Sequence, residues 1–175
     1  MGISSSKKRV ESSLHDSPEF DSACDSAYAH CLSLTQHAFD GVFPYQLSSA
    51  AAHLHRSLSS TSPLVSRWLP SPPSQSQVDR ALRATTRRRP LPPAGGGGDG
   101  PQLLDAAEFR EWAVELFAGA VVESAGRAVL TRVPIGVAGI AGLGMATRSG
   151  KEVIGSVIGV YALGVATLIY LGLSG

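Results

Sequence analysis

Apolar residues recur at intervals of three and four along the first half of the chain, which is the spacing of one helix face. The first such stripe follows Ser17 and Pro18, a favourable pair for the start of a helix. It extends to about Asp40, where Gly41 is expected to end the helix. Its members are Phe20, Cys24, Ala27, Cys31, Leu34 and Ala38.

Three further segments complete the pattern up to Thr86. A helix after Pro44 places four apolar side chains on one face: Leu47, Ala51, Leu54 and Leu58. A short apolar piece covers residues 63–69, and another helix is expected to begin at Ser76 or Gln77. Together these segments predict a small helical module over residues 16–86. Because its stripes are narrow and rich in alanine, we expect the module to be only marginally stable alone.

A linker and a long helix follow this module. Residues 87–101 are rich in proline and glycine, which cannot bury enough surface to offset the entropy of ordering. Residues 102–132 predict one amphipathic helix that begins at or near Asp105. Its apolar side carries Phe109, Ala113, Leu116 and Ala120, widened by Trp112 and Phe117. Its charged residues, Glu108, Arg110, Glu111 and Glu115, are expected to lie mostly away from that side.

The last part of the chain, residues 133–175, is rich in glycine and predicts a membrane region. Residues 153–173 carry no charge and would span ~31 Å as a helix, which matches a bilayer core of ~30 Å. This stretch predicts the main transmembrane helix. Small residues let membrane helices approach closely, and here they recur at intervals of four or close to it. They are Gly155, Gly159, Ala162 and Ala166.

A second apolar run precedes this stretch, and it leaves two topologies open. Residues 133–147 would reach only ~22 Å as a helix, which is short of a full span. The run therefore either is re-entrant or packs along the final helix in a tail-anchored protein, or it spans the membrane as the first arm of a hairpin. The basic residues on its flanks favour a cytosolic side before the last helix, and hence a single full span.

The amino terminus fits a lipidation signal. Gly2 after the initiator Met, with Ser6 four positions later, matches the pattern for N-myristoylation. One myristoyl chain binds membrane only marginally, so a second signal is normally needed. Lys7, Lys8 and Arg9 form a basic cluster that would contact anionic lipids. We expect residues 1–15 to be a disordered lipidation segment on the cytosolic side.

Composition and motifs exclude several classes of function. The chain has 15 Lys and Arg against 14 Asp and Glu, so its net charge of +1 does not favour binding to nucleic acid. It contains no fingerprint of a nucleophile elbow, a metalloprotease, a kinase or a dinucleotide site. We therefore expect no enzyme, no small-molecule substrate and no cofactor.

Cysteine and histidine spacing predicts no metal site either. Cys24 and Cys31 lie two helical turns apart, which is too far for a disulfide with each other, so we expect reduced, buried thiols. The spacing of the histidines at positions 30, 37, 53 and 55 also lacks the paired pattern of a zinc site.

The stretch 104–112 resembles the end of an EF-hand loop and its exiting helix. With Glu108 at the twelfth loop position, Asp105 takes the ninth and Leu104 the apolar eighth. The early positions depart from the motif, and Asp99 at the third is the one early carboxylate that remains. Residues 40–43 resemble a second, equally broken loop. The resemblance implies a degenerate helical pair without calcium, because calcium takes six to eight oxygens, most of them from the early positions.

The combined pattern predicts a mainly α fold: a small helical cytosolic module, a long amphipathic helix and a C-terminal Gly-rich transmembrane helix. This arrangement resembles small plant N-myristoylated membrane-anchored proteins. We expect a non-enzymatic adaptor or scaffold that contacts membrane lipids and a protein partner or a second copy. The alternatives are an oligomeric membrane protein, either a channel or a remodelling protein, and a degenerate EF-hand-like calcium-signalling protein. Acylation favours the plasma membrane, and a tail anchor would also fit an endomembrane or an organelle outer membrane.

Overall fold

The computed structural model describes residues 2–88 and 103–146, together with positions 163, 164, 167 and 171. Within these ranges the chain is mainly helical, as predicted, and its one β-type pairing is an isolated bridge between Val42 and Leu104. The helices are α1 (Gly2–His15), α2 (Pro18–Leu34), the 3-10 turn η1 (Pro44–Gln46), α3 (Leu47–Thr61), α4 (Pro63–Trp68), α5 (Gln75–Arg88) and α6 (Ala106–Ala146).

Helix α6 is the centre of the fold. Its 41 residues extend ~61 Å, and α1, α2, α4 and α5 all pack against its first half. Trp112, Phe117 and Val121 are fully buried there, and the Phe117 ring meets that of Phe20 from α2 edge-on at 6.1 Å. The segment 102–132, expected as a separate amphipathic helix, therefore supplies the core of the module. Residues 16–86 bury their apolar stripes against it.

Helix α2 confirms the predicted start and corrects the predicted end. The Ser17 hydroxyl oxygen accepts a hydrogen bond from the backbone N–H of Phe20 at 3.2 Å, and Pro18 is the first helical residue. The stripe is buried from Phe20 to Cys31, but the helix ends at Leu34, whose side chain is 57% exposed. Two consecutive residues with positive φ, Gln36 at 51° and His37 at 56°, turn the chain away from the helix axis.

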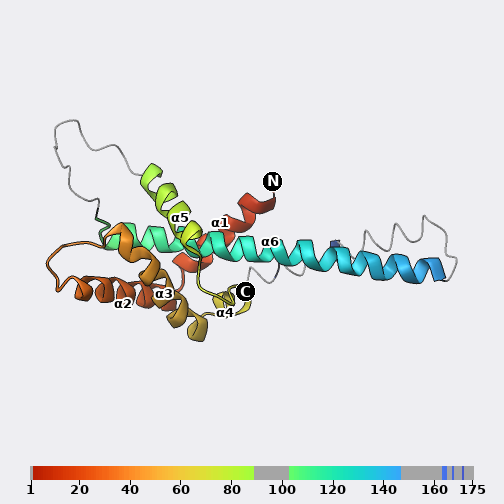
Figure 1. Cartoon of the computed structure of the whole chain (residues 1–175), viewed down its shortest axis with the longest axis horizontal. Helices are drawn as coiled ribbons and strands as arrows, with labels where there is room; N and C mark the ends of the chain where they lie inside the picture. Colours follow the sequence, from red (N-terminus) through yellow and green to blue (C-terminus); the bar gives the residue numbers. More distant parts are fainter. Residues whose placement is uncertain (1, 89–102, 147–162, 165–166, 168–170, 172–175) are drawn as a thin grey trace.

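The helices after η1 agree closely with the spacing of apolar residues in the sequence. The four apolar residues expected on one face of α3 are all buried, the short apolar piece forms α4, and the next helix begins at Gln75. Helices α2 and α3 lie side by side below α6 in the view of Figure 1, and α5 lies across it on the other side.

Helix α1 replaces the disordered segment expected over residues 1–15. It buries Val10 and Leu14 in the same core as the other helices, and Lys7 forms an ion pair with Glu115 on α6. Two apolar residues on a mostly polar helix give a weak periodic signal. A helix of this length is only marginally stable alone, so its contacts with α6 stabilise it.

The membrane region is described only in part. Helix α6 continues through the shorter apolar run as far as Ala146. None of the helices in the described residues combines the length and the apolar character needed to cross a bilayer. The predicted main span, 153–173, lies outside the described residues apart from positions 163, 164, 167 and 171.

Candidate functional site

Two interhelical loops meet at the bridge between Val42 and Leu104. The backbone N–H of each residue donates to the carbonyl oxygen of the other, both at 2.9 Å, and both side chains are buried. One loop follows α2 and the other precedes α6. A Cβ atom on Gly41 would lie 2.9 Å from the Leu104 carbonyl oxygen, so the close approach of the two loops requires glycine at this position.

The two loops repeat one capping arrangement. In the first, the Gln46 side-chain oxygen accepts from the backbone N–H of Phe43 at 2.9 Å. In the second, the Glu108 carboxylate accepts from the backbone N–H of Asp105 at 3.2 Å. Each pair begins at the residue after the bridge and spans three positions. Each side chain therefore reaches back to cap the start of its own helix, η1 for Gln46 and α6 for Glu108.

Side-chain oxygen atoms of both loops already accept hydrogen bonds within the fold, and this limits the ligands that the loops can bind. Glu108 holds the start of α6, and the Asp105 carboxylate accepts from the Glu108 backbone N–H at 2.8 Å. Gln46 is buried and also donates to the Cys31 carbonyl oxygen at 3.0 Å. Among the described residues no three His, Cys, Asp or Glu side chains gather as a metal site would require. Asp99, the remaining early carboxylate of the resemblance, lies outside the described residues.

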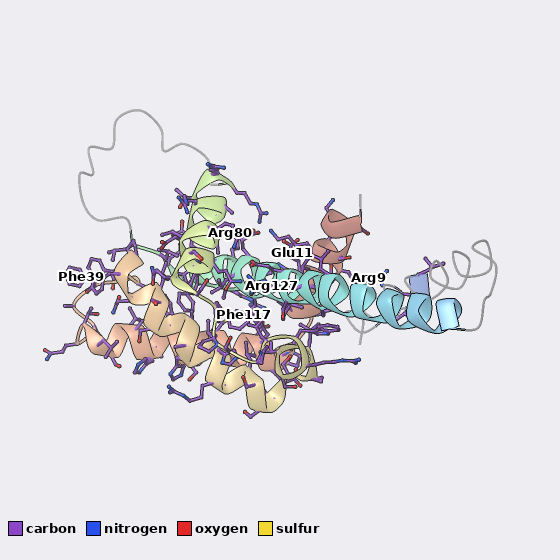
Figure 2. The ribbon with its side chains drawn as sticks, turned by 45° about the vertical axis from the view of Figure 1, so that its right-hand side comes forward. Arg9, Glu11, Phe39, Arg80, Phe117 and Arg127 are labelled. Atoms are coloured by element: carbon purple, nitrogen blue, oxygen red, sulfur yellow. The ribbon has the colours of Figure 1, made fainter. Side chains whose placement is uncertain are left out.

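The first loop also carries an exposed aromatic cluster. The Phe39 and Phe43 rings meet edge-on at 4.9 Å, and Phe43 stacks on Tyr45 at 5.3 Å. Phe43 is nearly buried, whereas Phe39 is 47% exposed and Tyr45 is 74% exposed. Figure 2 shows Phe39 at one end of the helical module, far along α6 from Arg127. Exposed aromatic side chains held by stacking are typical of protein-binding surfaces.

A groove of about 470 Å³ runs along α6 between α1 and α5. In both figures, α1 and α5 rise on the same side of α6 and diverge from it. The floor of the groove is apolar and belongs almost entirely to α6: Leu116, Gly119, Ala120, Val122, Gly126 and Leu130.

Charged side chains line the rim of this groove. Glu123 accepts hydrogen bonds from Gln77 and Arg80, both at 3.1 Å, and it pairs with Arg127. The hydrogen bond from Gln77, helped by the positive charges of the two arginines, lowers the pKa of the Glu123 carboxyl.

Glu115 is a buried carboxylate at the base of the same rim. It pairs with Lys7 of α1 and, at 3.0 Å, with the guanidinium of Arg88 of α5. The expectation that Glu115 lies away from the apolar side of its helix is wrong, because these two cations allow the carboxylate to be buried. Its position inside a run of apolar residues, 112–121, was the signal that could have revealed this role.

The thiols and most of the imidazoles lie on α2 and α3. Cys24 and Cys31 are buried and free, as predicted, and burial raises the pKa of the Cys24 thiol to about 12 and that of Cys31 to about 11. His30 of α2 and His53 of α3 stack at 4.8 Å on the surface. Partial burial, together with the nearby His30 and Arg56, lowers the pKa of His53.

The fold places the residues predicted to contact lipid in different environments. Gly2 is the first residue of α1, and Lys7 is half-buried against Glu115, while Lys8 and Arg9 are exposed. The small residues predicted to pack in the membrane, Gly155, Gly159, Ala162 and Ala166, lie outside the described residues.

Comparisons with family models, with curated proteins and with solved structures find no match to this chain.

Proposed function

We propose that this chain is a non-enzymatic, membrane-anchored adaptor that presents its helical module at the cytosolic face of a membrane. The observation that carries the proposal is the continuity of α6. This helix forms the core of the module around Trp112 and runs on without a break to Ala146. Whatever holds the segment after Ala146 therefore also holds the module. The proposed anchor is the uncharged stretch 153–173, whose length matches a bilayer.

The amino terminus supplies the second attachment in this proposal. Acylation of Gly2 and contact of Lys8 and Arg9 with anionic lipid would act together, at ~1 kcal/mol for each basic residue near the surface. Lys7 is also paired with Glu115 within the fold.

The exposed aromatic cluster of Phe39, Phe43 and Tyr45 supports the adaptor role. Aromatic side chains contribute large contact areas at low entropic cost, and they dominate the energetics of many protein interfaces. The cluster lies at the end of the module opposite the projecting end of α6. A partner could reach it while α6 is held at the membrane.

The bridge between the loops favours one alternative, an EF-hand-like calcium protein. Two helix–loop–helix units joined through their loops match the architecture that the sequence resembles. The oxygen atoms of Gln46 and Glu108, however, are already used as helix caps. We therefore propose a module that works without calcium. A calcium titration monitored by the fluorescence of Trp68 and Trp112 should leave the spectrum unchanged, and a saturable change would favour the alternative.

The anchor can be tested with the full chain inserted into microsomes. After an alkaline carbonate wash the wild-type chain should stay in the pellet, with residues 1–146 open to added protease. Leu163→Arg places a charge in the middle of the stretch, at a cost of ~3 kcal/mol for membrane insertion, and should release the chain. Ser174→Arg, outside the stretch, is the matched control and should remain bound. Release of the wild-type chain would refute the anchor.

The adaptor role can be tested separately by cross-linking in intact membranes. The full chain should form a discrete cross-linked product with a partner, and Tyr45→Ser should abolish that product. Glu111→Ser, an exposed change on α6 that is not part of the cluster, should leave it intact. A product that forms equally well with Tyr45→Ser would show that the aromatic cluster is not the partner surface.

A further inference from the structure

The groove between α1 and α5 is hollowed by two glycines of α6. A Cβ atom added to Gly119 or to Gly126 would meet no other atom within 4 Å. The two positions are seven residues apart, which is two helical turns, so both open on the same side of the helix. The hollow is therefore elongated along α6 for ~10 Å between them. It continues to Leu130, whose side chain is 73% exposed.

The charges around the groove determine which chemistry it can accept. Both rim carboxylates are already paired with cations of the same fold, Glu123 with Arg80 and Arg127, and Glu115 with Lys7 and Arg88. An occupant with polar groups would have to compete with these pairs. An aliphatic chain would only displace water from the apolar floor, which is favourable in proportion to the area buried.

The position of α1 indicates where such a chain would come from. Val10 and Leu14 fix α1 against the core, and Lys7 forms part of the groove wall. Gly2 lies five residues earlier in the same helix, ~7.5 Å further along its axis. The amine of Gly2 is the atom that the N-terminal motif would acylate.

We propose that the groove binds a saturated fatty-acyl chain attached to Gly2. This inference rests on the lipidation that is part of the proposed function. A single acyl chain binds a bilayer only marginally, whereas a chain tethered beside its own site has a high effective concentration there. The groove therefore competes with the membrane for the acyl chain. The anchoring of the protein then depends mainly on its C-terminal stretch.

The test uses the full chain co-produced with an N-myristoyltransferase and a diazirine-bearing myristate analogue. The acylated protein is reconstituted in phosphatidylcholine vesicles, irradiated, and mapped by mass spectrometry. We expect cross-links within residues 116–130. Gly126→Leu should abolish them, because its Cβ atom meets no other atom within 4 Å and the rest of the new side chain fills the hollow. Glu111→Leu places the same side chain at an exposed site outside the groove, and should leave the cross-links intact.

Three results would overturn the proposal. Cross-links from the wild-type protein to lipid alone would show that the acyl chain lies in the bilayer. Cross-links to residues 116–130 that persist in Gly126→Leu would show that it lies elsewhere on α6. If Gly2 does not take up the analogue, there is no acyl chain to occupy the groove. None of these results affects the carbonate test of the C-terminal anchor, so failure of the groove and failure of the anchor are distinguishable.

Discussion

Val42 and Leu104 exchange two backbone hydrogen bonds of 2.9 Å, and this bridge joins the loop after α2 to the loop before α6. The chain segments on either side of the bridge come together because Gly41 has no side chain. The Cβ atom of any other residue there would lie within 2.9 Å of both the Leu103 Cβ atom and the Leu104 carbonyl oxygen.

Gly41→Ala should therefore lower the free energy of unfolding by ~1–3 kcal/mol, because the added methyl group forces the two loops apart. Gly119→Ala is the matched control. It adds the same methyl group inside a helix where nothing lies within 4 Å, and should raise stability by up to ~1 kcal/mol. Chemical denaturation followed by circular dichroism measures both changes. Equal effects of the two substitutions would contradict the close approach at Gly41.

Glu115→Gln should loosen α1. The change removes a buried carboxylate that pairs with Lys7 and Arg88, and we expect a loss of ~1–3 kcal/mol. Hydrogen exchange should become faster in residues 5–14, where the backbone depends on docking against α6. Glu11→Gln removes only the pair with Lys7 at 3.7 Å within α1, and should cost no more than ~0.5 kcal/mol. Unchanged exchange in Glu115→Gln would show that apolar packing alone holds α1.

Stability should fall on acidification through the titration of His53. The pKa of this imidazole is lowered below its usual value of 6.5, so in mildly acidic solution the unfolded chain binds more protons than the folded one. The stabilisation is present above pH 6.5 and is lost progressively as the pH falls below that value towards the lowered pKa. His53→Gln should flatten this part of the pH profile. His15→Gln, on the exposed end of α1, is the control for the loss of a histidine, and an unaltered slope in His53→Gln would reject the assignment.

Cys24 and Cys31 should be unreactive in the folded protein. Burial raises the pKa values of the thiols to about 12 and about 11, so almost no thiolate exists at neutral pH. Alkylation with iodoacetamide, followed by mass spectrometry, should label neither residue in native buffer and both residues in urea. Rapid labelling in native buffer would indicate that α2 opens readily from the core.

Local signals in the sequence were sufficient for α2 and α3. The Ser17-Pro18 start and the buried apolar stripes follow directly from the residues, because capping and periodicity act within one helix. The end of α2 was placed too late, because an apolar Leu34 and Ala38 continued the stripe although both are exposed. Gln36 and His37 adopt positive φ angles at the turn, and neither residue type predicts such a conformation from the sequence.

Contacts between residues far apart in the sequence determine the parts of the fold that local patterns do not predict. The burial of Glu115 depends on Lys7 and Arg88, which lie on two other helices, so a polar residue on α6 was expected at the surface. Helix α1 was missed for the same reason, since it owes its order to α6. Leu104 was recognised as a special loop position through the EF-hand-like resemblance. Its pairing with Val42 became evident only when the two loops were seen together.

Helix α6 continues beyond the last buried residue of the module, Ala125, to Ala146, and this part of it is about 31 Å long. Because the helix is continuous, its length sets the orientation of the module as well as its distance from the far end of the helix. Each residue inserted into the projecting part would turn the module by about 100° around the helix axis and shift it by ~1.5 Å. The number of residues in the projecting part of α6 therefore sets the direction in which Phe39 and Tyr45 face around the helix axis.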